Sequence, residues 1–241
     1  MLRNQSNKLF LELMVKSGVS FFTKNQPNNY YILQKKIETE SKLSNNLQLE
    51  EIVTIKELAN YINRSDKCLL KNSAKKTVIA DGNPASKLMI IGEAPGKDED
   101  EQGIPFVGQA GQLLNKMLTA INIQRKDVYI TNVIPWRPPN NRPPTNEEIL
   151  LCLPFLQKHI ELIKPKFLLL LGATAAKSIL SSPLSISKLR NKWHEYSSMN
   201  LNLKIKTLVS YHPAFLLRSP QFKKEAWEDL QNLQQLMNQS K

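Results

Sequence analysis

From Lys87 onward the sequence alternates between short apolar runs and longer amphipathic stretches, and this alternation restricts the fold most strongly. Four apolar runs predict strands, over residues 88–91, 127–132, 166–171 and 204–210. Four stretches with helical periodicity predict helices, over residues 111–123, 145–163, 173–180 and 223–237. Strands that alternate with helices favour a mostly parallel sheet with helices on both faces. The sequence therefore predicts an α/β fold.

The residues before this alternation divide into two parts. Residues 8–22 predict a short amphipathic helix, and a polar, Lys- and Asn-rich stretch follows to about Glu50. We interpret residues 1–50 as a variable arm and residues 51–241 as the folded domain. Thr54 and Glu57 have the spacing of a capping box, which predicts the start of a helix that carries Leu58 and Ile62.

The charge balance of the chain is strongly basic. Lys and Arg number 33 against 21 Asp and Glu, so the net charge is +12 and the isoelectric point is about 9.6. This excess favours a polyanionic partner such as nucleic acid, although Lys residues that serve only solubility would also explain it. Two cysteines are too few for a disulfide scaffold, and the apolar stretch 9–15 is too short to span a bilayer. We therefore expect a cytoplasmic monomer without a membrane segment.

Polar side chains follow three of the predicted strands, and an aromatic loop lies between the first strand and its helix. Glu93 follows the first strand in the segment GEAPG, Asn132 ends the second, and His212 follows the fourth. Phe106 lies in the Gly- and Pro-rich segment GIPFVG. Ligands of open α/β sheets bind beyond the carboxyl ends of the strands, so we expect these four side chains to share one pocket.

The chemistry of these side chains indicates a planar ligand with a polar edge. An aromatic ring offers a stacking face, and an amide can donate to one atom of a heterocycle while accepting from the next. An imidazole can donate to developing negative charge, and a carboxylate can orient water or stabilise positive charge. A nucleobase satisfies all four groups.

Four segments together carry a family resemblance: GEAPG, GIPFVGQAGQLL, YITNVIPWRPPNNRPPT and YHPAFLLR. In this order and spacing they resemble the family 4 uracil-DNA glycosylases, over a region from about Cys68 to the C-terminus. The resemblance implies a three-layer α/β/α sandwich on a four-stranded parallel sheet. It also implies a monofunctional hydrolase that removes uracil from DNA and leaves an abasic site during base excision repair.

The resemblance further implies roles for the residues at the matching positions. Phe106 would stack on a flipped-out uracil, and Asn132 would read O4 and N3–H and so exclude cytosine. Glu93 would help position the attacking water or the glycosidic bond, and His212 would donate toward O2. The resemblance also implies roles for residues around the base and along the DNA. Gly92 and Ala94 would allow close approach of the backbone, and Glu99 would exclude the methyl group of thymine. Leu216 would insert into the DNA as a wedge, and Arg137, Arg142 and Arg218 would contact phosphates.

Several of these residues also have a purely structural interpretation. Glu93 could serve as a charge partner of a helix N-terminus, Asn132 could cap a turn, and Phe106 could belong to the core. His212 could be a structural histidine at the end of a strand. Leu216 is as well explained by the core as by a wedge, and each arginine could simply be solvated. Trp193, Trp227 and the methionines are assigned to the core, and His159 and His194 to structural or surface positions.

The cysteine pattern departs from the resembled family. Many members bind a [4Fe-4S] cluster through four cysteines, and the matching positions here hold Ser65, Cys68, Trp136 and Cys152. Because such clusters are held by four thiolates, we predict that this chain has no cluster and that Cys68 and Cys152 are ordinary buried thiols. Trp136 is expected to fill the vacated space.

Two other functions remain open from the sequence. A catalytically weak relative would act as a binding module for damaged or single-stranded DNA, a hypothesis motivated by the missing cysteines. A nucleotide hydrolase would use GEAPG as a phosphate cradle, but the chain has no GxxxxGK[ST] pattern.

Overall fold

A computed structural model describes residues 49–198 and 204–239 of this chain. The helix predicted over residues 8–22 lies outside the described residues, as does nearly all of the predicted arm. The boundary of the domain at residue 50 stays a prediction.

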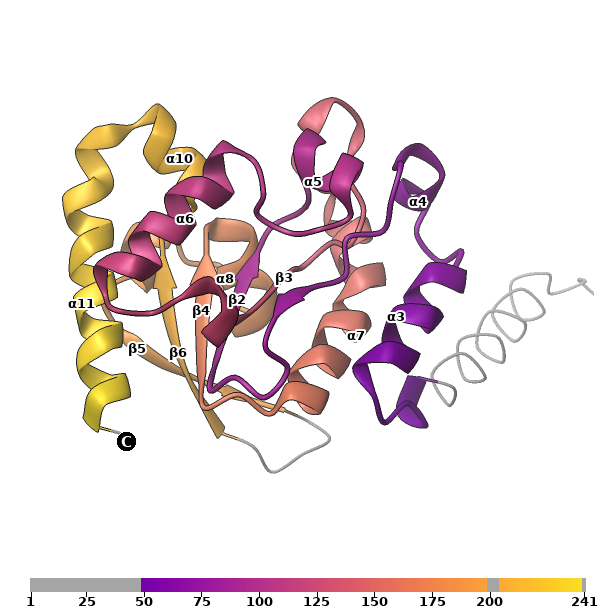
Figure 1. Cartoon of the computed structure of the whole chain (residues 1–241). Coiled ribbons are helices and arrows are strands. Elements are labelled where there is room, and N and C mark those ends of the chain that lie inside the picture. The colour runs from indigo at the N-terminus through magenta and orange to yellow at the C-terminus, as the bar shows by residue number, and fades with distance from the viewer. Residues whose placement is uncertain (1–48, 199–203, 240–241) are drawn as a thin grey trace, which may run out of the picture. The chain divides into compact units, whose positions relative to one another are not determined.

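A mixed sheet forms the centre of the fold (Figure 1), and its strand order is β1-β3-β2-β4-β6-β5. The strands are β1 (Asp81–Gly82), β2 (Leu88–Gly92), β3 (Tyr129–Asn132), β4 (Phe167–Leu171), β5 (Trp193–Ser197) and β6 (Lys204–Ser210). β3, β2, β4 and β6 pair in parallel, whereas the two edge strands pair antiparallel. The polar residues that follow the parallel strands therefore meet at one edge of the sheet.

Helices pack on both faces of this sheet (Figure 1). One face is covered by α6 (Gln109–Ala120) and α11 (Lys223–Gln239), and the other by α3 (Ile55–Arg64), α7 (Asn146–Ile163) and α8 (Ala173–Leu180). The shorter helices are α4 (Leu70–Ser73), α5 (Lys97–Gln102), α9 (Ile186–Leu189), α10 (Pro213–Arg218) and the single turns η1 (Arg125–Asp127), η2 (Pro139–Asn141) and η3 (Pro220–Phe222). The three layers agree with the predicted α/β/α sandwich.

Alternation along the strands explains how one sheet serves two apolar clusters. In β2, Leu88 and Ile90 pack toward α6 and α11, and Met89 and Ile91 pack toward α3, α7 and α8. Successive side chains of a strand point to opposite faces, so a continuous apolar run is required where both faces are covered. This is why β2 and β4 read as unbroken apolar segments.

Capping explains where two of the helices begin. The Thr54 hydroxyl accepts from the amide of Glu57 at 3.2 Å, and the Glu57 carboxylate accepts from the amide of Thr54 at 3.1 Å. Thr145 and Glu148 make the same reciprocal pair at the start of α7. The capping box predicted at Thr54 is confirmed, and Leu58 and Ile62 are buried on α3 as expected.

Within residues 49–198 and 204–239, the sheet has six strands rather than the four expected. β1 has two residues, and β5 has a polar sequence of which only Tyr196 is buried. An edge strand needs neither an apolar run nor great length, so hydropathy does not reveal it. The predicted helix over 111–123 is α6, which begins two residues earlier and ends at Ala120.

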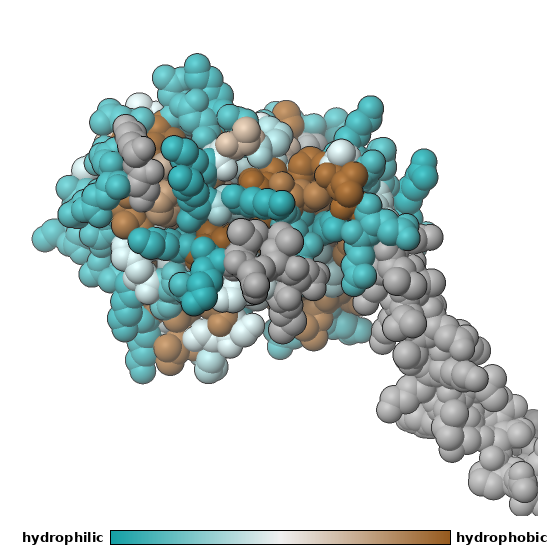
Figure 2. Space-filling view, turned by 90° about the horizontal axis from the view of Figure 1, so that it is seen from below, coloured by the Kyte–Doolittle hydropathy of each residue, from teal (hydrophilic) through white to brown (hydrophobic). Residues whose placement is uncertain are grey.

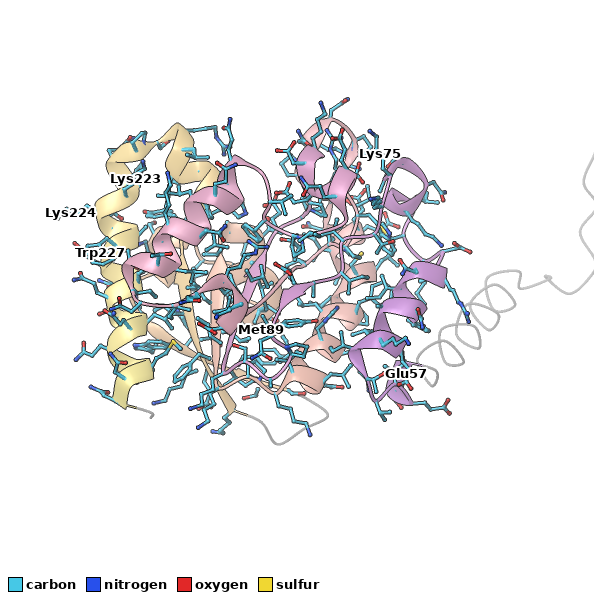
Figure 3. All side chains as sticks on the ribbon, in the orientation of Figure 1. Glu57, Lys75, Met89, Lys223, Lys224 and Trp227 are labelled. Carbon is cyan, nitrogen blue, oxygen red and sulfur yellow. The ribbon has the colours of Figure 1, made fainter. Side chains whose placement is uncertain are left out.

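The assignment of two tryptophans to the core was wrong. Trp193 and Trp227 are 38% and 39% exposed. Trp227 lies on the outer side of α11, whereas Met89 lies within the sheet (Figure 3). The inward positions of α11 are Ala226, Leu230 and Leu233, which leaves the neighbouring Trp227 at the border of the apolar face.

The two remaining histidines outside the candidate pocket have structural contacts, as expected. The Tyr129 hydroxyl lies 2.9 Å from Nδ1 of His159, whose burial lowers its pKa to about 4. Nε2 of His194 lies 2.7 Å from the carbonyl of Leu189.

Seen from below, hydrophilic residues cover much of the surface and apolar residues gather in smaller groups between them (Figure 2). Within the part of the chain that the structure describes, we find no helix with the length and apolar character needed to cross a bilayer.

Candidate active site

A cavity of about 560 Å³ lies at the carboxyl edge of the parallel strands, a size typical of small-molecule sites. Its lining comes from the ends of β2, β3, β4 and β6 and from the loops that follow them. Eight predicted site residues line it: Glu93, Ala94, Glu99, Phe106, Asn132, Arg142, His212 and Arg218. The structure thus brings together the residues that were expected to share one pocket.

Glu93 is half-buried at the end of β2 and has a partner that sequence reasoning missed. The Thr174 hydroxyl, in the first turn of α8, donates to Oε2 of Glu93 at 2.5 Å. The Glu93 carbonyl accepts from the amide of Ile134 at 3.0 Å, which continues the pairing of the two strands beyond their ends. Both the backbone and the carboxylate of Glu93 are therefore held.

Asn132 ends β3 opposite Gly92 of β2 and is 5% exposed. A Cβ on Gly92 would lie 2.4 Å from Oδ1 of Asn132 and 2.5 Å from Cζ of Phe106. No side chain fits in that space, so a glycine is needed for the Asn132 amide and the Phe106 ring to pack against the backbone of residue 92. Gly92 therefore shapes the cavity through the absence of a side chain.

Phe106 presents its ring to the cavity from a strained backbone with φ +54°. Its ring centre lies 5.5 Å from that of His212, at an interplanar angle of 30°. The Arg125 guanidinium donates to the carbonyl of Phe106 at 2.9 Å and to that of Pro105 at 2.6 Å, and it pairs with Asp81 at 2.7 Å. These contacts hold the loop in a conformation that a non-glycine residue rarely adopts.

Glu99 organises the loops around the cavity. One carboxylate oxygen accepts from the amides of Val107 and Gly108 at 2.9 Å each, and the other accepts from the amide of Gly96 at 3.1 Å. Both oxygens are thus engaged with backbone N–H groups at the start of α5 and before α6. The implied exclusion of a methyl group by Glu99 stays a prediction.

His212 caps α10, and this contact sets its tautomer. Its Nδ1 accepts from the amide of Ala214 at 3.1 Å, so in the neutral ring the proton is on Nε2. Burial, and secondarily the charge of Arg218, lowers the pKa of His212 to about 4. At neutral pH the side chain is therefore an uncharged donor on the lining of the cavity.

A buried ionic network supports the segment that carries His212. Arg190 pairs with Asp229 at 3.0 Å and with Glu225 at 2.9 Å. Ser210 donates to Asp229 at 2.8 Å, and the Tyr211 hydroxyl donates to Glu225 at 3.0 Å. The two residues before His212 are thereby anchored to α11.

Two of the three arginines that were predicted to bind phosphate have acidic partners. Arg142 forms a bidentate pair with Glu148, with distances of 2.8 and 2.6 Å, and this contact lowers the pKa of Glu148 to about 2. Nε of Arg137 donates to Asn141 at 2.7 Å, and the Arg137 guanidinium lies 3.9 Å from Asp100. Arg218 is exposed at the cavity beside His212.

Leu216 occupies the core rather than the surface. It is 1% exposed and packs with Tyr211 and Ala226 in a small apolar cluster. A side chain in this position would have to leave the core to enter DNA, which favours the core interpretation over the wedge. The next residue, Leu217, is 41% exposed.

The four positions that match cluster ligands do not form a four-thiolate set. Cys68 and Cys152 are buried free thiols, and a hydrogen bond from Cys152 lowers the pKa of Cys68 to about 7. Trp136 is 1% exposed, packs edge-on against Phe155 and donates to the Thr77 hydroxyl at 3.1 Å. No group of three or more potential metal ligands occurs among the described residues.

The sequence predicted the polar side chains that follow the strands, but it did not predict the residues that hold the site in place, which are Thr174, Arg125 and Arg190. Thr174 follows the third strand, and it was missed because Ala173–Leu180 was interpreted only as a helix. The rule that ligands bind beyond the carboxyl ends of parallel strands applies to this strand too, so a usable signal was present. Arg125 and Arg190 carried no comparable signal.

Comparison with known proteins identifies the family to which this geometry belongs. Residues 79–231 match the sequence model of the uracil DNA glycosylase superfamily. The chain belongs to the uracil DNA glycosylase superfamily. It is 40% identical over 178 residues to a type-4 uracil-DNA glycosylase of Pyrobaculum aerophilum, an alignment that covers 73% of this chain and 91% of that protein.

Further members of the superfamily show the same level of similarity. The type-4 enzyme of Archaeoglobus fulgidus is 40% identical over 70% of this chain and 86% of its own length. The type-4 enzyme of Thermotoga maritima is 37% identical over 70% of this chain and 85% of its own length. The resemblance seen in the four sequence segments is therefore confirmed.

Proposed function

We propose that this protein hydrolyses the N-glycosidic bond of uracil in DNA and leaves an abasic site, as a step of base excision repair. The observation that supports this most directly is the convergence of Phe106, Asn132, His212 and Glu93 on one cavity. Type-4 uracil-DNA glycosylases at 37–40% identity over most of this chain support the same reaction.

The proposed recognition of uracil uses one stacking face and one polar edge. Phe106 stacks on the base, and the Asn132 amide donates to O4 and accepts from N3–H. Cytosine presents the reverse pattern at this edge, with an amino donor and an N3 acceptor, so it is discriminated against. Gly92 and Ala94 let the base approach the backbone, and Glu99 limits the space beside C5.

The proposed chemistry is a simple hydrolysis. The bond between the water oxygen and C1′ forms, the C1′–N1 bond breaks, and its electron pair leaves with uracil. The proton that the water loses ends on the released uracil anion, so the products are uracil and an abasic sugar with a C1′ hydroxyl. His212 donates from Nε2 toward O2, where negative charge gathers, and Glu93 faces the water and the developing positive charge on the sugar. A fixed donor of this kind contributes roughly 3–4 kcal/mol to catalysis.

A base-release assay tests the proposal. The full chain is incubated with single- and double-stranded oligonucleotides that contain one uracil, and alkali then cleaves any abasic site. We expect strand breaks with uracil and none with thymine or cytosine. Tight binding of uracil DNA without base release would instead favour the alternative function, a binding module for damaged DNA.

The wedge is proposed to be Leu217 rather than Leu216. We expect Leu217→Ala to slow release from duplex DNA about tenfold, the equivalent of roughly 1.4 kcal/mol, and to affect single-stranded DNA less, because only a duplex requires base flipping. Leu216→Ala is the matched variant, and its expected effect is a loss of roughly 2–5 kcal/mol in stability. Equal losses on both substrates for Leu217→Ala would contradict the assignment.

We further propose that the enzyme works without an iron–sulfur cluster. Such a cluster is held by a set of four cysteine thiolates, whereas the matching positions supply only the thiols of Cys68 and Cys152. At a third position, the indole ring of Trp136 is buried instead. Protein purified aerobically or anaerobically is expected to be colourless and to contain no stoichiometric iron. Visible sulfide-to-iron absorption with about four irons per chain would overturn this.

The proposed contacts to DNA are electrostatic and independent of sequence. Arg218 is placed to hold a backbone phosphate beside the cavity, and Arg137 and Arg142 would exchange acidic partners for phosphates. That the enzyme acts as a monomer in the cytoplasm stays a prediction, which light scattering and fractionation would check.

A further inference from the structure

The segment that follows β4 lies between the two proposed catalytic side chains. The amide of Gly172 donates to the carbonyl of Ser210 at 2.9 Å, and a Cβ on Gly172 would lie 3.1 Å from Cβ of His212. Gly172 and Ala173 line the cavity, and the next residue, Thr174, reaches across to Glu93. This short segment therefore touches both the Glu93 and the His212 sides of the site.

The contact between Thr174 and Glu93 is a short, direct hydrogen bond. The Thr174 hydroxyl donates to Oε2 of Glu93 at 2.5 Å. Thr174 belongs to the first turn of α8, where the N-terminal end of the helix favours a negative charge. Both side chains are half-buried, so water competes little for the bond.

We infer that Thr174 is a positioning residue that holds the Glu93 carboxylate in its catalytic orientation. The hydroxyl occupies Oε2, which restricts rotation of the carboxylate and leaves Oε1 for the attacking water or the sugar. Because Thr174 bonds to Glu93 but is not among the residues that line the cavity, we expect its effect to pass through Glu93. This inference rests on the proposed function and adds one residue to it.

A double-mutant cycle tests the inference. Thr174→Val keeps the shape of the side chain and removes its hydroxyl, whereas Thr174→Ser keeps the hydroxyl. We expect Thr174→Val to lower the single-turnover rate of uracil release about 10- to 100-fold, as misplacement of a catalytic group does, without weakening DNA binding. Thr174→Ser should retain nearly the full rate. Thr119→Val makes the same chemical change on α6, where the exposed Thr119 hydroxyl donates to the carbonyl of Asn115 away from the cavity, and should have no effect.

The decisive measurement is the same change in a Glu93→Gln background. If Thr174 acts through Glu93, Thr174→Val should cost little further rate there, because residues that act as a unit are not additive. The inference is overturned if Thr174→Val has the wild-type rate, or if it loses the same factor in both backgrounds. Thr174→Ala supplies a second variant without the hydroxyl, and DNA binding by anisotropy shows that each variant is folded. Failure of the wild type to release uracil would count against the proposed function itself.

Discussion

His212→Ala is expected to lower the single-turnover rate of uracil release about 100- to 1000-fold, the loss typical of one preorganised donor. The imidazole lines the cavity as an uncharged ring whose Nε2 carries the proton, because Nδ1 accepts from the amide of Ala214. Without it, the charge that gathers on O2 as the C1′–N1 bond breaks has no donor from this side. The measurement is alkali-induced strand cleavage over time with enzyme in excess of DNA.

The matched control for this change is His194→Ala, because His194 is another histidine, and its contact with the Leu189 carbonyl lies outside the cavity. We expect His194→Ala to keep the wild-type rate. A His212→Ala variant that also keeps it, while binding DNA normally, would remove His212 from the mechanism.

The pH dependence of the reaction follows from the same environment of His212. Burial and the nearby Arg218 lower its pKa to about 4, so the ring stays neutral from pH 8 down to about pH 5. The rate should therefore have no inflection near pH 6.5, the ordinary pKa of histidine. The lowered pKa of His212 also makes the free energy of unfolding depend on pH. Between pH 6.5 and about pH 4 the imidazole is protonated in the unfolded chain but neutral in the folded protein, so the stability present above pH 6.5 is lost progressively as the pH falls. An inflection near pH 6.5 that disappears in His212→Ala would contradict the neutral form.

Asn132→Asp is the second change for which we expect a large effect, again about 100- to 1000-fold on uracil release. The amide is nearly isosteric with a carboxylate, so the shape of the cavity is kept while its hydrogen-bonding pattern changes. An ionised aspartate only accepts hydrogen bonds and repels O4 of uracil, whereas it accepts well from the amino group of cytosine. We therefore expect a measurable release of cytosine by this variant.

Oligonucleotides that contain a single labelled uracil or cytosine separate the two activities of Asn132→Asp. Asn232→Asp on α11 is the matched control, since Asn232 makes a surface contact with Asn191. If Asn132→Asp still released uracil at the wild-type rate, the edge of the base would be read by another group.

Much of the fold was predictable because its central strands and helices are buried in a periodic way. The runs at 88–92 and 167–171 lie between two layers of helices, so their apolar character follows directly from their position. The run at 204–210 is mixed, because Lys204 and Lys206 are exposed and it is fully buried only from Thr207 onward. The capping residues Thr54 and Thr145 marked the beginnings of α3 and α7 for an equally local reason. The edge strands β1 and β5 were not predictable, because pairing on one side demands little of their side chains.

The sequence by itself determined which chemical groups follow the strands: a carboxylate at Glu93, an amide at Asn132 and an imidazole at His212. Parallel strand order then requires that such residues meet at one edge of the sheet, so their shared cavity was expected. Only the tertiary structure decided how each group is held, because the partners come from distant segments. The Thr174 hydroxyl, on helix α8, bonds to Glu93 after β2, and the Arg125 guanidinium bonds to the carbonyl of Phe106 from the turn before β3. The burial of Leu216 depends on how α10 packs. The place of Thr174 directly after a strand was visible in the sequence, but its partner was not. The contact of Arg125 and the burial of Leu216 depend on long-range packing that has no local periodicity, so the sequence pattern carries no sign of them.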